Sequence, residues 1–408
     1  MHNSDKRKSS GAIKKANSFI YWILRCVFIP VMYLLFRYKF DRKTSKGIKR
    51  PCLILSNHQT VLDAFAVGVG FRFGINYVAS DTIFRHGFKS KLMMILARPI
   101  PFSKGSSDSS AIRNMMSVIK SGGCVGMFPS ANQSFFGSES TIVPGIGKLA
   151  RKFGVPLVLV QLRGGFLTKP RWKAMPNKGK MRGAVSRVVS AEELAAMSPA
   201  EIDDIIFKEL NFNDFEYNKT AKIVFRGKHR AEYLESVLFY CPECHSLSGL
   251  HSQGNEFFCR DCGMGVRLGE TIIFEKIKKA EKVPDTILEW SAMQLNYIKG
   301  IDYSPFSAKP LFRDEGITFK LAQRARNETL LGTGTIEFFN DRFTVCGQDF
   351  FFVDSTLSLQ GVRKLTMYNK DSVYAIESPL KMNLVKYMIC GYCQRNKILN
   401  IKEEYYGY

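Results

Sequence analysis

The chain has 408 residues, which is long enough for two or three domains and one sizeable core. Apolar residues make up 45% of it and charged residues 23%, as in globular proteins, and the ten cysteines do not form the framework of a secreted, disulfide-rich protein. We therefore expect a reducing compartment. The formal net charge of +23 indicates an anionic partner, which is a nucleic acid, a membrane surface, or an acidic carrier or substrate.

The first elements of the chain combine positive charge with an apolar run. Residues 1–50 hold thirteen Lys or Arg residues and two Asp residues, a net charge of +11, and residues 19–36 are almost entirely apolar. Arg25 and Pro30 interrupt this run, so a helix lying in the membrane interface fits at least as well as a spanning one. Residues 1–45 are thus predicted to associate with membrane lipids at the cytoplasmic face, where basic residues meet anionic lipid. A buried core helix is the alternative.

Residues 46–232 alternate short apolar runs with helical patterns, which predicts an α/β core. The expected strands and the helices just before them are residues 52–56, 108–121, 123–128, 147–153 and 155–161.

A histidine and an aspartate, His58 and Asp63, lie just after the first of these strands. At a strand-to-helix turn the aspartate can turn back and accept the imidazole N–H, which leaves the other ring nitrogen basic. This is a catalytic triad without its serine, and the missing nucleophile is then the hydroxyl of a substrate that attacks an acyl thioester. The spacing alone is a weak signal, because an ordinary helix cap produces it as well.

Further blocks strengthen this interpretation, and they follow in order as residues 97–104, 128–134, 145–150 and 154–160. With them, residues 50–165 resemble the glycerolipid acyltransferase family, which includes glycerol-phosphate and lysophosphatidate acyltransferases. The segment from Asn57 to Asp63 is similar to the N-H-x4-D motif of that family. The resemblance implies a mixed sheet flanked by helices and an N-terminal membrane-associated helix. It also implies transfer of a fatty acyl group from acyl-carrier protein or acyl-CoA to a glycerolipid hydroxyl, with no catalytic cofactor.

The chain departs from the family pattern where the acceptor is held. The third family block usually reads Phe-Pro-Glu-Gly-Thr-Arg-Ser. Here Ser130 stands in place of the Glu, Asn132 in place of the Thr and Gln133 in place of the Arg. Lys104 stands where the second block usually ends in Arg. A guanidinium binds phosphate through two hydrogen bonds, which an amide cannot reproduce. We therefore predict a lysolipid acceptor with a larger or neutral head group, bound by these four residues and Asn57.

Residues 233–270 carry an independent motif. Cys241-x2-Cys244 is followed after fourteen residues by Cys259-x2-Cys262, the spacing of a zinc ribbon with four converging thiolates. We predict one structural Zn²⁺; a redox dithiol and an iron–sulfur site are the alternatives.

Residues 271–408 open with a helical pattern over residues 284–298 and continue as short strands around an Asn340-Asp341 turn. A helix follows at residues 382–390, and with it Cys390-x2-Cys393, which is more typical of buried thiols than of a metal site. This C-terminal β-rich domain faintly resembles a pleckstrin-homology domain, which would dock lipid head groups or a protein partner.

The sequence thus predicts a membrane-associated acyltransferase with His58 and Asp63 as catalytic residues. One alternative is a catalytically inactive lipid-binding homologue. The other is a membrane-tethered nucleic-acid-binding protein, which we disfavour because the residues around the ribbon are close to neutral, so no nucleic acid is expected as a partner.

Overall fold

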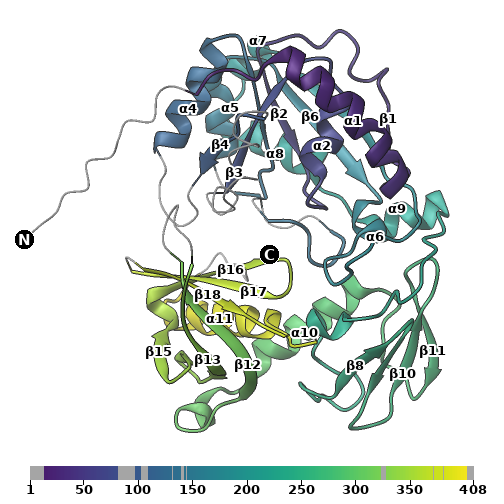
Figure 1. Ribbon diagram of the computed structural model, residues 1–408, viewed down its shortest axis with the longest axis vertical. Helices are drawn as coiled ribbons and strands as arrows, with labels where there is room; N and C mark the ends of the chain where they lie inside the picture. Colours follow the sequence, from purple (N-terminus) through teal and green to yellow (C-terminus); the bar gives the residue numbers. More distant parts are fainter. Residues whose placement is uncertain are drawn as a thin grey trace, which may run out of the picture.

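The computed structural model in Figure 1 describes residues 13–80, 97–102, 109–130, 132–138, 142–143, 145–322, 328–370, 372–379 and 381–401. The first part of the chain contains α1 (Ser18–Phe36), β1 (Lys39–Phe40), β2 (Cys52–Ser56), α2 (Asp63–Gly68), β3 (Ile75–Ser80), β4 (Ile100–Phe102), α4 (Ser109–Lys120), β5 (Cys124–Met127), α5 (Ile146–Phe153), β6 (Leu157–Arg163), α6 (Gly165–Thr168), β7 (Arg182–Val189), α7 (Ala191–Ala196), α8 (Pro199–Leu210) and α9 (Asp214–Ala221).

Strands of this part form one mixed sheet, whose order within the described ranges is β1-β7-β6-β2-β5-β3-β4. The β6–β7 pair is antiparallel and the remaining pairs are parallel. The central strand β2 is buried at every residue, as expected for a parallel strand covered on both faces. This architecture confirms the predicted mixed α/β core, and the strands and helices expected there appear within a few residues of their predicted ends.

Two apolar layers cover the two faces of this sheet. Helices α1 and α2 pack on one face, with Met32, Phe36 and Val67 against Ile54 and Val160. Helices α4, α5, α7 and α8 pack on the other face and share a core with the alternate residues of the same strands. Local signals set the helix ends: α8 begins with a capping box in which Ser198 and Glu201 satisfy each other's backbone N–H groups.

Helix α1 is the predicted apolar helix, and it is long and apolar enough to cross a membrane by length and composition. Only 11% of its most apolar window is buried inside the protein, so the alternative of a buried core helix does not hold. Phe19, Trp22 and Leu34 are 68%, 57% and 78% exposed. The strand β1 that follows pairs with β7 of the core sheet, so the chain after α1 continues directly into the α/β part.

The second part contains η2 (Leu234–Ser236), β8 (Leu250–Gln253), β9 (Glu256–Cys259), β10 (Gly265–Leu268) and β11 (Phe274–Lys278). These four strands form an antiparallel sheet in the order β11-β10-β9-β8. The sheet continues past residue 270 because β11 pairs with β10.

The third part contains α10 (Ile287–Gly300), η3 (Ser304–Phe306), β12 (Phe312–Leu321), β13 (Thr329–Phe338), β14 (Arg342–Val345), β15 (Gln348–Phe351), η4 (Phe352–Asp354), β16 (Ser355–Gln360), β17 (Lys364–Asn369), β18 (Ser372–Glu377) and α11 (Val385–Ile398). The sheet order over the described strands is β15-β14-β13-β12-β18-β17-β16, and every pair is antiparallel. Most of α11 is buried against it. The C-terminal region is therefore rich in β-structure, as predicted, and its likeness to a pleckstrin-homology domain stays a prediction.

Candidate acyl-transfer site and cysteine cluster

The centre of the site is a histidine–aspartate pair: His58 lies in the loop between β2 and α2, and Asp63 is the first residue of α2. His58 Nδ1 lies 2.8 Å from Asp63 Oδ2; the histidine side chain is 18% exposed and the aspartate side chain is fully buried. With Asp63 ionised, Nδ1 carries the hydrogen and Nε2 is the free basic nitrogen. The partly exposed imidazole can reach a substrate while its partner is shielded from water.

Asp63 is held in place by the backbone of the same loop. Its Oδ2 atom also accepts hydrogen bonds from the N–H groups of Gln59, at 2.5 Å, and Thr60, at 2.8 Å. Its Oδ1 atom accepts a bond from the Thr60 hydroxyl at 2.7 Å. These donors fix the orientation of the carboxylate, and through it that of the imidazole.

The loop after β5 contacts His58 on two sides. The Phe128 ring stacks on the imidazole with ring centroids 4.3 Å apart, and the Tyr77 ring also stacks on Phe128, at 6.1 Å. The Ser134 N–H donates to the His58 carbonyl oxygen at 2.8 Å. The third sequence block therefore lies directly against the histidine, although 70 residues separate Phe128 from His58 in the chain.

The predicted substrate-binding residues occupy different places. Ser130 is buried and donates its hydroxyl to the Asn132 carbonyl, whereas the Asn132 and Gln133 residues are partly exposed in the same loop. Asn57 is buried, and its amide bonds both the N–H and the C=O of Leu162 on β6, at 2.7 and 2.8 Å. It thus joins two strand ends next to the site. Lys104 lies outside the described residues.

A comparison of the sequence with known protein families agrees with this geometry. Residues 37–162 match the family model described as Acyltransferase, and this range contains His58, Asp63 and every predicted substrate-binding residue. The match covers less than a third of the chain. It bears out the predicted resemblance of this segment to acyltransferases, and the glycerolipid acceptor stays a prediction.

Two other comparisons concern the chain as a whole. No curated protein matches it. Among solved structures, the chain is similar to the crystal structure of the 1-acyl-sn-glycerophosphate (LPA) acyltransferase PlsC from Thermotoga maritima. The sequence identity is 14% and the TM-score 0.40, over 47% of this chain and 78% of that one.

The sequence does not predict a buried hydrogen-bond network that begins at Gln59, in the loop between β2 and α2. Gln59 donates to Asp214 at 2.9 Å and accepts from the Gly165 N–H at 2.8 Å. Asp214 also accepts from the N–H groups of Gly164 and Phe166, and burial raises the pKa of its carboxyl group to about 6. Since 155 residues separate Gln59 from Asp214, no local pattern reveals this pairing.

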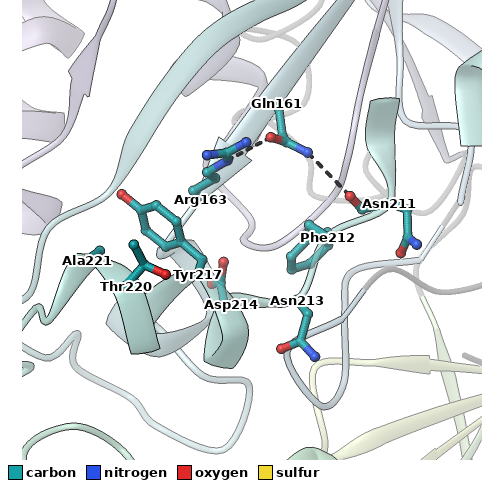
Figure 2. A pocket seen from close by; sticks show the side chains of 9 residues that line it. All are labelled: Gln161, Arg163, Asn211, Phe212, Asn213, Asp214, Tyr217, Thr220 and Ala221. Carbon is teal, nitrogen blue, oxygen red and sulfur yellow. Dashed lines mark hydrogen bonds between the residues drawn. The ribbon is translucent and has the colours of Figure 1, made fainter. Parts of the chain in front are cut away.

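Asp214 of this network also lines a cavity of about 520 Å³, and His58 is not among the residues that line the cavity (Figure 2). Gln161 and Arg163 line it, and they alternate along β6 with Val160 and Leu162, which pack in the α1 and α2 layer. Successive strand residues point to opposite faces, so the cavity lies on the face of the sheet away from α1 and α2. We therefore do not assign acyl transfer to it.

The four predicted metal ligands converge in the second part of the chain. The Sγ atoms of Cys241, Cys244, Cys259 and Cys262 all lie within 4.8 Å of one another. Two of the separations, 3.8 and 3.7 Å, match the edge of a tetrahedron with Zn–S bonds of about 2.3 Å. The donor set thus fits a closed zinc site with four thiolates.

The two cysteine pairs sit on equivalent turns. The N–H groups of His245 and Gly263 donate to the carbonyls of Cys241 and Cys259, at 2.9 and 3.0 Å. Both donors have positive φ, 63° for His245 and 76° for Gly263. This repeated geometry presents both thiols of each pair on one side of the turn, as a metal requires.

Proposed function

We propose that this protein is a membrane-associated acyltransferase, which transfers a fatty acyl group from an acyl thioester to a hydroxyl of a lysophospholipid or related glycerolipid. The supporting observation is the bond between His58 and the buried Asp63, inside the acyltransferase-family segment. Acyl-carrier protein or acyl-CoA supplies the thioester, and both are anionic partners suited to a chain of net charge +23.

In the proposed reaction, His58 Nε2 takes the proton of the acceptor hydroxyl as its oxygen attacks the thioester carbonyl carbon. Asp63 stabilises the imidazolium that forms. The C–S bond then breaks as the ester C–O bond is retained, and the leaving thiolate takes the proton from Nε2. The histidine is neutral again at the end, so no other reactant is needed.

Helix α1 supports a role at the membrane. One side packs on the core through the buried Met32 and Phe36, while Phe19, Trp22 and Leu34 are exposed. A helix that lies lengthwise on a folded domain with aromatic residues exposed fits the membrane interface better than a span. The basic N-terminal residues would then contact anionic lipid at the cytoplasmic face.

The acceptor follows from the third sequence block. Gln133 offers an amide where the family has an arginine, which argues against glycerol 3-phosphate and for a bulkier lysolipid. The nucleic-acid alternative loses support, since Arg267 of the ribbon is paired with Glu256 at 2.8 Å.

The test is acyl transfer by purified protein with a panel of lysolipids and glycerol 3-phosphate, using both acyl-CoA and acyl-carrier protein. We expect His58→Gln and His58→Ala to lower kcat on the order of 100-fold or more. A glutamine can still bond Asp63 but cannot accept the proton. His229→Gln, at an exposed histidine far along the chain, is the matched control and should keep wild-type kcat.

Wild-type kcat in both His58 variants would refute the mechanism. Efficient acylation of glycerol 3-phosphate, with no better acceptor in the panel, would refute the lysolipid assignment. Binding of lysolipid without any transfer would instead support the inactive lipid-binding homologue.

A further inference from the structure

Arg171 lies in the loop just after α6, outside the segment that matches the acyltransferase family. Its neighbour Trp172 is buried, donates from Nε1 to the Arg230 carbonyl at 3.0 Å, and packs edge-on against Phe166. The tryptophan therefore anchors the backbone from which the arginine side chain extends.

The guanidinium group of Arg171 joins two distant parts of the chain. Nη1 donates to the Gln133 carbonyl at 2.9 Å, in the loop of the third sequence block. Nη2 donates to the carbonyls of Leu359 and Gly361, at 3.2 and 2.8 Å, at the turn between β16 and β17. The guanidinium carbon also lies 3.6 Å from the centre of the Phe135 ring.

A gain in folding stability does not explain the burial of the Arg171 guanidinium. None of the ion pairs between described residues involves Arg171, and its buried Nε atom has no hydrogen-bond partner among them. Burial lowers the pKa of the guanidinium to about 9, which reflects the cost of desolvating an unpaired charge. A geometric role accounts better for a cation that is held by three carbonyls and a ring.

The contact at Gln133 leads directly to the histidine. The next residue, Ser134, donates its N–H to the His58 carbonyl at 2.8 Å. The turn of the C-terminal sheet, Arg171, the third-block loop and the base are thus connected by successive hydrogen bonds. The planar, forked guanidinium is required for this connection, because a single ammonium group cannot bond the Gln133 carbonyl and the β16–β17 turn at the same time in a fixed plane.

We propose that Arg171 is a positioning residue, through which the C-terminal β-rich domain fixes the loop segment of Asn132, Gln133 and Ser134 against His58. This inference rests on the proposed function, in which that loop binds the acceptor. The C-terminal domain is then a working part of the acyltransferase, and displacement of the β16–β17 turn weakens acceptor binding.

The experiment measures the KM values for lysolipid and for acyl donor separately in Arg171→Ala and Arg171→Lys. We expect acceptor KM to rise about tenfold or more in both variants, because charge-assisted hydrogen bonds are lost, with donor KM unchanged. Lysine restores the charge but not the fork, so rescue of acceptor KM by Arg171→Lys overturns the proposal. The proposal is also overturned if the variants only contain fewer active molecules, and the folded molecules keep the wild-type acceptor KM.

A second pair of variants tests the C-terminal side. Gly361 and Gly347 both have positive φ, 62° and 81°, with open space where a side chain would project, but only Gly361 contacts Arg171. Gly361→Val should strain the β16–β17 turn and raise acceptor KM, whereas Gly347→Val should not. Equal effects of the two substitutions, or full additivity of Gly361→Val with Arg171→Ala, overturn the coupling.

Hydrogen exchange separates this inference from the proposed function. Arg171→Ala should speed exchange of the Ser134 amide, which bonds His58, whatever reaction the protein catalyses. Unchanged exchange there overturns the inference even if the wild type is an active enzyme. Absence of acyl transfer in the wild type, with faster exchange in the variant, refutes the function and leaves the coupling supported.

Discussion

At the scale of single residues, the site depends on how completely Asp63 is held. One buried carboxylate accepts bonds from an imidazole, two backbone N–H groups and a hydroxyl. Every partner is a donor, so the ionised form is satisfied and no alternative side chain reproduces it. Removing the charge therefore alters the tautomer of His58 as well as the shape of the loop.

Asp63→Asn tests this arrangement. An asparagine NH₂ facing Nδ1 forces the hydrogen onto Nε2, which removes the basic nitrogen. We expect kcat to fall on the order of 1000-fold or more in the folded fraction. Thermal unfolding should show a loss of about 1–3 kcal/mol, because backbone donors lose their acceptor. Asp63→Asn with wild-type turnover would contradict the role of Asp63.

Asp214 predicts a pH dependence of stability. Burial raises its pKa to about 6 from an ordinary value near 4, so between these values the folded state binds more protons than the unfolded state. The stability that protonated Asp214 contributes is thus fully present below about pH 4. It is lost as the pH rises through about 6, and the free energy of unfolding falls by on the order of 3 kcal/mol. Urea unfolding between pH 4 and 7 should show this loss in the wild type and not in Asp214→Asn. Parallel curves for the two proteins would show that the Asp214 pKa is not raised.

At the scale of elements, α1 has two different sides. Met32 is fully buried against the sheet, whereas Trp22 and Leu34 face outward. Deleting the whole segment would also remove Phe36 and β1 from the core, so it cannot separate membrane binding from folding. Single substitutions on the two sides can.

Trp22→Ser with Leu34→Ser should weaken binding to anionic vesicles more than tenfold, since burying each apolar side chain contributes about 2 kcal/mol. The melting temperature should change little. Met32→Ser, the matched control on the inner side, should lower the melting temperature and leave the vesicle affinity of the folded protein unchanged. Wild-type vesicle binding in the Trp22 and Leu34 double variant would argue against membrane contact through α1.

At the scale of the whole molecule, one apolar core joins the parts of the chain. It runs from Phe135 and Trp172 through Phe257 and Trp290 to Tyr387. The Trp290 indole also donates to the Tyr240 carbonyl, next to the first cysteine pair. This bond connects the first cysteine pair to α10 of the C-terminal part.

We predict one structural zinc per chain, bound by the four cysteines, and metal analysis of protein purified without added zinc measures it. Structural zinc contributes on the order of 10 kcal/mol to folding of small zinc domains, so Cys259→Ser or chelation should lower the melting temperature of the C-terminal part. Cys346→Ser, at an exposed cysteine outside the cluster, is the control. Freely alkylated Cys241 and Cys259 in native protein that contains no metal would refute the zinc assignment.

Local patterns in the sequence determined much of this protein. His58 and Asp63 are five residues apart, and each cysteine pair is three apart, so backbone turns alone bring their side chains together. The strand β2 and the helix α10 likewise follow from runs of residues close in the chain. Such short-range features are readable because the polypeptide geometry permits few alternatives.

Only the tertiary structure decided which distant residues complete the site. The amide of Asn57, a predicted substrate-binding residue, bonds the β6 backbone, and Arg171 binds the backbone carbonyl of Gln133 rather than its side chain. The pairing of Gln59 with Asp214 and the link from Gly361 to Arg171 join segments more than 150 residues apart in the chain. Loops fold against one another by long-range burial, and no periodicity or spacing encodes which carbonyl a given guanidinium will meet.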